Sequence, residues 1–469
     1  MTGFFPRFVT AALRGGAGKT TLSLGMIAAW KSLGRKVSAF KKGPDFIDSA
    51  WLSLAAQRPC RNLDTFLLGP QIVQQSFGQN AETQGVSLIE GNRGFFDGMD
   101  SRGTHSTAEL AKLLQTPVVL ILDCNRVTRT LAAMVLGCQK LDPEVDIRGV
   151  ILNRVATSRQ ERVLRASIED SCHLPVLGAV PRMDDFPFPE RHLGLTPPQE
   201  HQWVSRALEE AAKAALKYLD LEEIWKLAQS VPLFRWERGE EREKFKLGSS
   251  LRPVIGVVKD SAFQFYYPEN LQALVERGAK LIEISAVRER ELPELDALYI
   301  GGGFPETHAE QLADNLPFRR SLRGAVENGL PVYAECGGLM YLGESLNLGD
   351  RNYPMVGALP VTFSMEKRPQ GHGYTLLEVE RENPFYSPGR VLKGHEFHYS
   401  RVLSVKEDRV YFAFRVKRGA GIKDQKDGMG YKNVLATYSH VHALGCGEWA
   451  KSLIRRAVER KTTVPAAAV

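Results

Sequence analysis

The chain has 469 residues, of which 43% are hydrophobic and 25% charged, a globular balance that excludes a disordered or fibrous protein. Lysine and arginine number 61 against 54 aspartate and glutamate residues, so the formal net charge is +7. Because these charges form no single-sign block, neither nucleic acid nor a membrane surface is singled out as a partner, and a small substrate rich in carboxylates or phosphates fits equally well.

No apolar run approaches the length of a membrane span, and the first residues lack the order of segments that marks a secretory signal. The six cysteines show no C-x-x-C pair and no zinc-binding spacing, and they are too sparse for a disulfide scaffold. We therefore expect a cytoplasmic protein with no nucleic acid and no membrane as a partner.

The first half alternates short apolar runs with amphipathic stretches. The apolar runs predict strands over residues 8–12, 37–40, 86–90, 118–122 and 149–152, and a helix is expected over 20–33. Strands of this length separated by helices predict a parallel, doubly wound α/β sheet. Residues 208–227 then predict one long helix.

A mixed-charge segment without apolar periodicity separates the two halves, and we predict a linker over residues 236–252. Beyond it the alternation restarts, with strands expected over 254–258, 280–284, 297–300 and 332–334. The sequence therefore predicts two α/β domains, residues 1–235 and 253–469.

A glycine-rich segment follows the first predicted strand and opens the first helix, which is the context of a phosphate-binding loop. Glycine lets backbone N–H groups wrap phosphate oxygens, Lys19 can reach the β- and γ-phosphates, and the Thr20 hydroxyl is placed for Mg²⁺. Because position 13 is Leu, the strict pattern fails, and the segment instead resembles the variant loop of ParA/MinD and dethiobiotin-synthetase ATPases. A glycine-rich turn without a nucleotide is the alternative. The candidate ATP-binding residues of this loop are Gly15, Gly16, Gly18, Lys19, Thr20 and Thr21.

Acidic residues at the ends of later predicted strands are candidates for holding Mg²⁺ and directing the reaction. Asp45 and Asp48 follow the second strand, Glu90 ends the third, and Asp97 comes shortly after it. Any one of these acids alone would more often cap a turn. Because the carboxyl ends of parallel strands converge on one crevice, the set as a whole favours a metal–nucleotide site.

Cys336, in the second half, lies between an apolar strand and a predicted helix and is flanked by small residues that permit a sharp turn. This position favours a thiolate nucleophile, with nearby backbone N–H groups and the glycine segment 301–303 as an oxyanion hole. The base would be His440 or His442, which share a face of a local strand, so spacing leaves both open. A buried structural cysteine is the alternative.

The segment 393–400 holds two further histidines around a glutamate, in the order Gly-His-Glu-Phe-His. Its spacing is not that of an H-E-x-x-H zinc site. We therefore expect this segment to contact substrate or to support the fold.

Together these motifs resemble the cobyrinic acid a,c-diamide synthase family over nearly the whole chain. An ordered series of this kind is specific to the family, whereas no single member of it would be. The motifs are residues 16–21, 42–48, 61–64, 90–91, 96–98, 153–155, 178–182 and 190–195 in the first half, and 302–306, 334–338, 394–400 and 438–440 in the second.

The resemblance implies a P-loop synthetase domain followed by a class I glutamine amidotransferase-like domain. It implies ATP- and glutamine-dependent amidation of the a and c acetate groups of a corrin-type tetrapyrrole, through an acyl phosphate and with ammonia from glutamine hydrolysis. ATP, glutamine and a tetrapyrrole polycarboxylate are then the substrates, Mg²⁺ is the cofactor, and a homodimer is left open.

The resemblance also implies roles for the candidate residues. Because His442 stands where the usual glutaminase triad has a glutamate, it implies a Cys–His dyad. The implied sets are Thr20, Asp45 and Glu90 for Mg²⁺; Asp48 and Asp97 near the reacting carboxylate; Asn153 at adenine, by likeness to dethiobiotin synthetase; Cys336 as nucleophile with His440 as base; and Gly303 and Gly337 in the oxyanion hole.

Three alternatives remain. Phe46, Leu13 and Arg14 depart from residues that are common in the family, so the same chemistry on sirohaem, nickel-sirohydrochlorin or hydrogenobyrinate stays open. An amidotransferase for another acid, such as a cell-wall precursor, would leave several of the ordered motifs unexplained. A ParA/MinD-like switch ATPase explains the loop but leaves the domain around Cys336 without a role.

Overall fold

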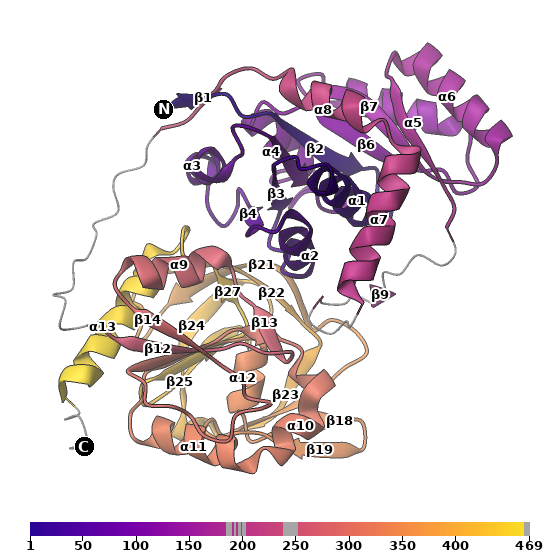
Figure 1. Cartoon of the computed structure of the whole chain (residues 1–469). Helices are drawn as coiled ribbons and strands as arrows, with labels where there is room; N and C mark the ends of the chain where they lie inside the picture. Colours follow the sequence, from indigo (N-terminus) through magenta and orange to yellow (C-terminus); the bar gives the residue numbers. More distant parts are fainter. Residues whose placement is uncertain (184–189, 192–193, 196–197, 199–202, 238–251, 464–469) are drawn as a thin grey trace. The chain divides into compact units, whose positions relative to one another are not determined.

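The chain divides into two units, Met1–Glu240 and Glu241–Val469. The computed structural model describes residues 1–183, 190–191, 194–195, 198, 203–237 and 252–463 (Figure 1). Most of the predicted linker and part of the motif at 190–195 lie outside the described residues. The linker was predicted to start at Trp236, but this residue packs in the first unit, where its ring stacks on Phe234 and its carbonyl accepts a hydrogen bond from the amino group of Met1.

The first unit consists of short strands joined by helices. Its strands are β1 (Thr2–Gly3), β2 (Arg7–Ala12), β3 (Val37–Lys42), β4 (Arg61–Leu63), β5 (Val86–Glu90), β6 (Val118–Asp123), β7 (Ile147–Val155), β8 (Val176–Pro181), β9 (Glu190–Arg191), β10 (Gly194–Leu195) and β11 (Phe234–Arg235). Its helices are α1 (Lys19–Ser32), α2 (Ile47–Ala56), α3 (Pro70–Asn80), α4 (Thr107–Leu113), α5 (Thr130–Leu141), α6 (Ser158–Cys172), α7 (Val204–Tyr218) and α8 (Leu221–Gln229).

A seven-stranded parallel sheet in the order β4-β3-β5-β2-β6-β7-β8 forms the centre of the first unit. Helices cover the sheet, and every residue of β2, β3 and β5 is buried, including the polar ones. From β2 the chain first builds one side of the sheet and later, from β6, the other. The topological switch point, where ligands bind in such sheets, therefore lies beside the carboxyl end of β2.

The helix predicted over 208–227 is two helices, α7 and α8. Leu219 has an extended conformation (φ −113°, ψ 142°), and the Asp220 carboxylate accepts a hydrogen bond from the Glu223 N–H at 2.9 Å. An aspartate that caps a new helix interrupts the apolar pattern by only one residue, so periodicity alone does not reveal the break.

The second unit combines a mixed sheet with flanking helices. Its strands are β12 (Val254–Val258), β13 (Phe263–Phe265), β14 (Lys280–Ile284), β15 (Ala297–Ile300), β16 (Gly302–Gly303), β17 (Val332–Glu335), β18 (Ser345–Leu348), β19 (Arg351–Pro354), β20 (Val361–Met365), β21 (Gly371–Val379), β22 (Val391–His398), β23 (Ser400–Val405), β24 (Tyr411–Arg418), β25 (Lys426–Tyr431), β26 (Val434–Thr437) and β27 (His440–Val441). Its helices are α9 (Pro268–Glu276), α10 (Ala309–Asp314), α11 (Leu316–Glu327), α12 (Gly337–Leu342) and α13 (Gly447–Thr463), with 3₁₀ turns η2 (Pro305–His308) and η3 (Glu407–Arg409).

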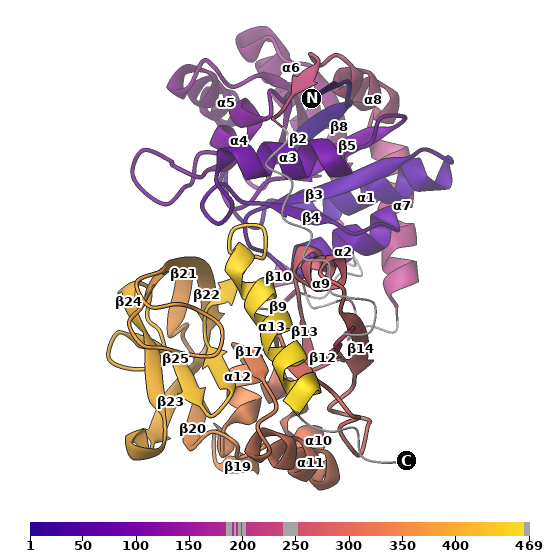
Figure 2. The ribbon, with the colours of Figure 1, turned by 90° about the vertical axis from the view of Figure 1, so that its left-hand side faces the viewer.

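The main sheet of this unit runs in the order β14-β12-β15-β17-β26-β25-β24-β21-β22-β27. Its first five strands are parallel, and antiparallel strands continue it, with β21, β22 and β24 side by side (Figure 2). Along β15 the side chains alternate between two cores, because Leu298 and Ile300 belong to one and Ala297 and Tyr299 to the other. The predicted α/β class, a parallel sheet domain followed by an amidotransferase-like α/β domain, is confirmed.

No helix in the described part of the chain is both long and apolar enough to cross a membrane.

Candidate active sites

The loop predicted to bind phosphate, residues 13–18, lies between β2 and α1. Gly16 and Gly18 have φ angles of 70° and 90°, and a Cβ on Gly18 would come within 2.2 Å of the Asn153 side-chain nitrogen, so this position has room only for glycine. Gly15 and Gly16 are exposed, and α1 begins directly after the loop. An anion at this helix start can therefore meet several backbone N–H groups.

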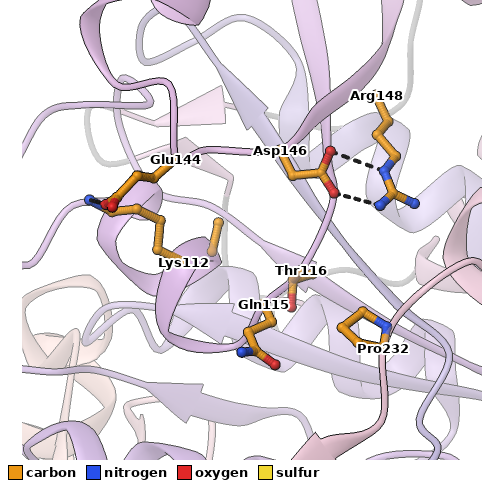
Figure 3. Close-up of a pocket in the computed structure, with 8 residues that line it drawn as sticks. Lys112, Gln115, Thr116, Glu144, Asp146, Arg148 and Pro232 are labelled. Atoms are coloured by element: carbon orange, nitrogen blue, oxygen red, sulfur yellow. Dashed lines mark hydrogen bonds and ion pairs between the residues drawn. The ribbon is translucent and has the colours of Figure 1, made fainter.

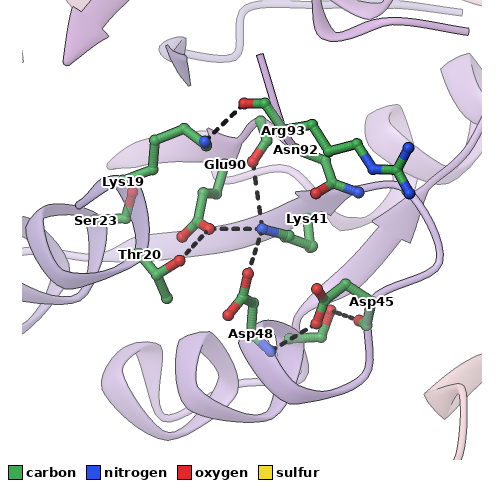
Figure 4. Close-up of polar contacts among 12 residues, drawn as sticks. Lys19, Thr20, Ser23, Lys41, Asp45, Asp48, Glu90, Asn92 and Arg93 are labelled. Atoms are coloured by element: carbon green, nitrogen blue, oxygen red, sulfur yellow. Dashed lines mark hydrogen bonds and ion pairs between the residues drawn. The ribbon is translucent and has the colours of Figure 1, made fainter. Parts of the chain in front are cut away.

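The two polar residues that follow the loop point to opposite sides of the site. The ammonium of Lys19 donates a hydrogen bond to the carbonyl of Arg93 at 2.8 Å (Figure 4) and another to the carbonyl of Arg14 at 3.4 Å. The Thr20 hydroxyl donates to Glu90 Oε1 at 2.8 Å, and Thr21 lies in the first turn of α1. Burial, and next the charge of Lys41, lowers the pKa of Lys19 to about 8.

A buried lysine joins the predicted acidic residues. Lys41 Nζ lies 2.6 Å from both Asp48 Oδ2 and Glu90 Oε1, and Figure 4 shows it between these carboxylates, with Asp45 beside Asp48. Burial alone would lower the pKa of Lys41. The carboxylates of Asp48 and Glu90 outweigh the effect of burial and raise this pKa. A charged lysine between two buried carboxylates is what keeps so many acidic groups tolerable in one place.

Glu90 is fully buried and Asp45 is partly buried. Burial, and next the charge of Asp48, raises the pKa of Asp45 to about 7, and one of its carboxylate oxygens accepts the Asp48 N–H at 2.8 Å. Burial also raises the pKa of Glu90, against the pull of Lys41. Three of the four predicted acids, Asp45, Asp48 and Glu90, are thus brought together at the carboxyl ends of β3 and β5.

The fourth acid, Asp97, closes its own turn, since its carboxylate accepts the Gly94 N–H at 2.9 Å. Its charge nevertheless reaches Lys19, whose pKa it raises slightly against the other effects. Asn153 lies on the other side of the loop and donates to the Ala17 carbonyl at 2.9 Å. Both residues therefore border the loop.

Magnesium fits the oxygen ligands beside the loop. Glu90 Oε2 is buried and has no hydrogen-bond partner among the described residues, and its other oxygen contacts Thr20. Mg²⁺ prefers such hard ligands and commonly takes only one or two from the protein, with substrate phosphates and water as the others.

Asp123, which the sequence analysis did not single out, and Arg154, from the motif 153–155, belong to this loop's surroundings. Asp123, at the end of β6, pairs with both Arg14 and Arg154, and Arg154 also donates to the Gly16 carbonyl at 2.8 Å. Arg154 has a positive φ of 59°. A local signal for Asp123 is present in the sequence, because an acidic residue here ends an apolar strand. Its pairing with the two arginines could not be predicted, because they lie far from it in the sequence.

The first unit also has a pocket of about 490 Å³ away from this site (Figure 3). It lies at the amino ends of β6 and β7, the sheet edge opposite the loop. Its charged side chains pair with neighbours, Lys112 with Asp142 and Arg148 with Asp146. We assign it no function.

In the second unit, Cys336 occupies a strained turn between β17 and α12, with φ 48° and ψ −100°. Its N–H is bonded to the Thr437 carbonyl at 2.7 Å, which fixes the turn. Gly337 and Gly338 lie so close to β16 and β15 that a Cβ would come within 3.0 Å of Gly303 N and 2.6 Å of Ile300 O, respectively. The sharp turn predicted from the small residues is therefore present, with Gly303 and Gly337 side by side.

A carboxylate holds His440 in place. His440 Nδ1 lies 3.3 Å from Glu335 Oε2, the same oxygen accepts the Tyr299 hydroxyl at 2.9 Å, and Glu335 Oε1 accepts the Val441 N–H at 3.1 Å. The expectation of a dyad without an acid is therefore corrected. Glu335, directly before the cysteine, takes the orienting position that sequence spacing assigned to residue 442.

His442 points to a different partner. Its Nε2 lies 3.6 Å from Glu269 Oε2, and its ring lies beside that of Tyr267. In contrast, the Cε1 edge of the His440 ring lies against Gly302. A Cβ added to Gly302 would come within 2.5 Å of His440 Cε1. Since Gly302 precedes Gly303 on β16, the geometry favours His440 over His442 as the base.

The Cys336 thiol is almost fully buried and lies 3.9 Å from the Phe397 carbonyl. Burial, with smaller contributions from the carboxylates of Glu306 and Glu335, raises its pKa well above the ordinary value. The resting thiol is therefore protonated and needs a base in order to react.

The segment 393–400 supports the surroundings of Cys336. The Glu396 carboxylate accepts hydrogen bonds from the N–H groups of Ala420 and Gly421. The rings of His398 and Tyr438 are stacked, with their centroids 3.6 Å apart. These contacts match the expectation of a supporting role, and the segment's first histidine, His395, lies on the opposite face beside His440.

The chain is similar to proteins of known class in both units. A CobQ/CobB/MinD/ParA nucleotide binding domain matches residues 8–195, and a CobB/CobQ-like glutamine amidotransferase domain matches residues 254–446. Proteins named cobyrinate a,c-diamide synthase are similar over nearly the full length. That of Magnetococcus marinus is 42% identical over 96% of this chain and 97% of its own, and that of Archaeoglobus fulgidus is 39% identical over 97% and 98%.

Proposed function

Because the chain belongs to the family of cobyrinate a,c-diamide synthases, which are amidating ligases that use glutamine, we propose that it amidates the a and c acetate carboxylates of a corrin-type tetrapyrrole. Residues 1–235, with Trp236 packed against them, are the ATP-dependent synthetase domain. The linker continues to residue 252, and residues 253–469 are the glutaminase domain. The observation that carries the proposal is the pair of separate constellations. One is a phosphate loop with Thr20 bonded to Glu90, and the other combines a cysteine at a strained turn with a histidine that Glu335 holds against Gly302.

In the first domain the loop binds the ATP phosphates, and Lys19 stabilises the charge on the group being transferred. A substrate carboxylate oxygen attacks the γ-phosphorus, the bond to the β-phosphate oxygen breaks, and ADP leaves. Ammonia then attacks the acyl phosphate carbon, phosphate leaves, and the amide nitrogen loses a proton. Asp48 and Asp97 lie near the reacting carboxylate, and Asn153 contacts adenine.

Thr20, Glu90 and Asp45 would hold Mg²⁺, which would supply positive charge to neutralise the ATP phosphates. The buried, unpartnered Oε2 of Glu90 supports this assignment. Lys41 keeps Glu90 and Asp48 in place through its 2.6 Å contacts with both.

In the second domain His440 takes the proton of the Cys336 thiol, and the sulfur attacks the glutamine amide carbon. The N–H groups of Gly303 and Gly337 stabilise the oxyanion, and His440 returns the proton to the departing ammonia. Water then hydrolyses the thioester to glutamate and the free thiol. Glu335 holds the imidazole and stabilises its positive charge, as the acid of a triad does.

A substrate panel tests the proposal. ATP hydrolysis with glutamine is measured in the presence of cobyrinic acid, hydrogenobyrinic acid, sirohaem or nickel-sirohydrochlorin. We expect cobyrinic acid to stimulate ATP turnover most and to be converted to a diamide. Stimulation by another member alone would move the same chemistry to that tetrapyrrole. Stimulation by none of them, with DNA stimulating instead, would favour a switch ATPase.

Gly302→Ala is expected to lower glutamine hydrolysis by about 10- to 100-fold, because the new methyl group would displace the His440 ring from its position. The rate of glutamate release measures the effect. Gly324→Ala on α11 is the matched control, since a Cβ there meets nothing within 4 Å. Equal rates of glutamate release by Gly302→Ala and Gly324→Ala would show that the contact between His440 and Gly302 is unimportant for glutamine hydrolysis.

The alkylation rate of Cys336 by iodoacetamide, measured without glutamine, is expected to rise with pH and to reach no plateau below about pH 9, since the raised pKa of the thiol keeps it protonated. Mass spectrometry of the cysteine peptide gives the rate. A plateau below about pH 7 would instead mean a resting thiolate–imidazolium pair and would contradict the neutral resting state.

A further inference from the structure

A second buried histidine lies directly beside His440. His395 on β22 and His440 on β27 are Cα partners in the antiparallel pairing of these strands. Their rings are nearly parallel, with centroids 5.0 Å apart and an interplanar angle of 24°. The mechanism above gives His395 no role, although it comes from a segment that the sequence singled out.

His395 is anchored by a tyrosine hydroxyl. Its Nδ1 lies 3.2 Å from the hydroxyl of Tyr267, a buried residue directly before α9. The Tyr267 ring in turn lies 4.5 Å from the ring of His442, which contacts Glu269 on α9. The anchor is thus part of a buried polar cluster that joins α9 to β22 and β27.

The two stacked rings are electrostatically different. Burial, and then the neighbouring His440 and His442, lowers the pKa of His395 well below its ordinary value. His440 has the Glu335 carboxylate at its Nδ1, and two adjacent rings cannot both be charged at low cost. Of the two stacked rings, only His440 thus has a carboxylate partner, and His395 is the ring for which a positive charge is disfavoured.

The titratable groups around this pair come from several elements. They are Glu335 on β17, Tyr299 on β15, Tyr374 and His372 on β21, Tyr267 and Glu269 at α9, and His442 after β27.

We infer that His395 is a positioning residue for glutamine hydrolysis, which holds the face of the His440 ring while Glu335 holds its Nδ1 and Gly302 receives its Cε1 edge. Three contacts then fix the imidazole in position and orientation, which a base that must meet both the thiol and the leaving nitrogen requires. This inference rests on the proposed function, because it assumes that His440 is the base.

The test compares His395→Ala with His395→Phe in the full-length enzyme. Alanine removes the ring and is expected to lower kcat for glutamine hydrolysis by about 10- to 100-fold with little change in KM. Phenylalanine keeps a ring against His440 and is expected to recover activity to within about fivefold of the natural enzyme. Val391→Ala, at an exposed position on the same strand as His395, is the control and is expected to be unchanged.

Tyr267→Phe removes the anchoring hydroxyl. It is expected to lower kcat a few-fold in the natural enzyme and to have no effect in the His395→Phe background, because the two changes interrupt the same contact. Rapid quenching with labelled glutamine separates positioning from misfolding, since the amplitude of thioester formation counts intact sites and its rate reports the geometry. We expect a full amplitude with a reduced rate.

A reduced amplitude with an unchanged rate would overturn the inference, since that result marks a merely structural residue. Equal losses in His395→Ala and His395→Phe would overturn it as well, because the ring would then not matter. If Cys336→Ala still hydrolyses glutamine, the proposed function itself fails, whatever the His395 variants do.

Discussion

Replacing Cys336 by alanine is expected to abolish amidation driven by glutamine, by a factor of about 10³ or more, while amidation driven by ammonia continues. Cys336 is the residue at the strained turn, beside Gly303 and within the field of Glu335, and alanine offers no nucleophile. The first unit does not contain this residue, so the synthetase reaction needs only an external source of ammonia. The measurement is the amount of amide product formed from each nitrogen donor.

Cys446→Ala is the matched control, because this cysteine lies in the same unit near Trp449 and has no role in the mechanism. It should retain both activities. Loss of the ammonia-driven reaction in Cys336→Ala would contradict the division of labour between the two units.

The second large effect is expected for Glu90→Gln, which should lower amidation from both nitrogen donors by about 10²- to 10³-fold. Glu90 is fully buried, accepts the Thr20 hydroxyl and lies 2.6 Å from Lys41, so an amide in its place weakens the proposed metal site and leaves the lysine with Asp48 alone. ATP turnover with cobyrinic acid and ammonia measures this effect.

The second unit provides the internal check for this variant. Alkylation of Cys336 and glutamine hydrolysis should both proceed at the natural rate. Glu222→Gln is the control in the same unit. Glu222 lies on α8, is exposed and pairs with Arg35. An active Glu90→Gln variant would remove Glu90 from the proposed chemistry.

Much of the fold could be predicted because several parallel strands are short apolar runs. β12 and β15 match the predicted residues and contain no charged position, since they lie inside the sheet. The edge strand β14 also matches, although its Lys280 and Glu283 are exposed. The antiparallel strands beyond residue 371 were not predicted. β21 and β24 alternate buried and half-exposed residues over lengths at which turns and loops show similar patterns.

The candidate sites were predictable where function and local sequence coincide. The glycines of the phosphate loop and the small residues after Cys336 are required by backbone geometry, so they leave a local pattern. Glu335 was missed as a partner of His440 because 105 positions separate the two, and only the adjacency of β17, β26 and the following strand brings them together.

Lys41 is a second example. Its sequence signal is a lysine at the end of an apolar strand, which usually marks the point where a strand reaches solvent. Here the lysine is buried because Asp48 and Glu90, from two other elements, compensate its charge. Charge compensation across a sheet depends on strand order, which sequence patterns do not specify.

The most direct test of the central claim follows nitrogen from glutamine into the product. The enzyme is given ATP, cobyrinic acid and glutamine whose side-chain amide carries the heavy nitrogen isotope, and the corrin product is weighed by mass spectrometry. We expect a diamide in which both new amides carry the heavy isotope, formed only when ATP is present. An unmodified corrin, despite glutamine hydrolysis and ATP turnover, would contradict the account.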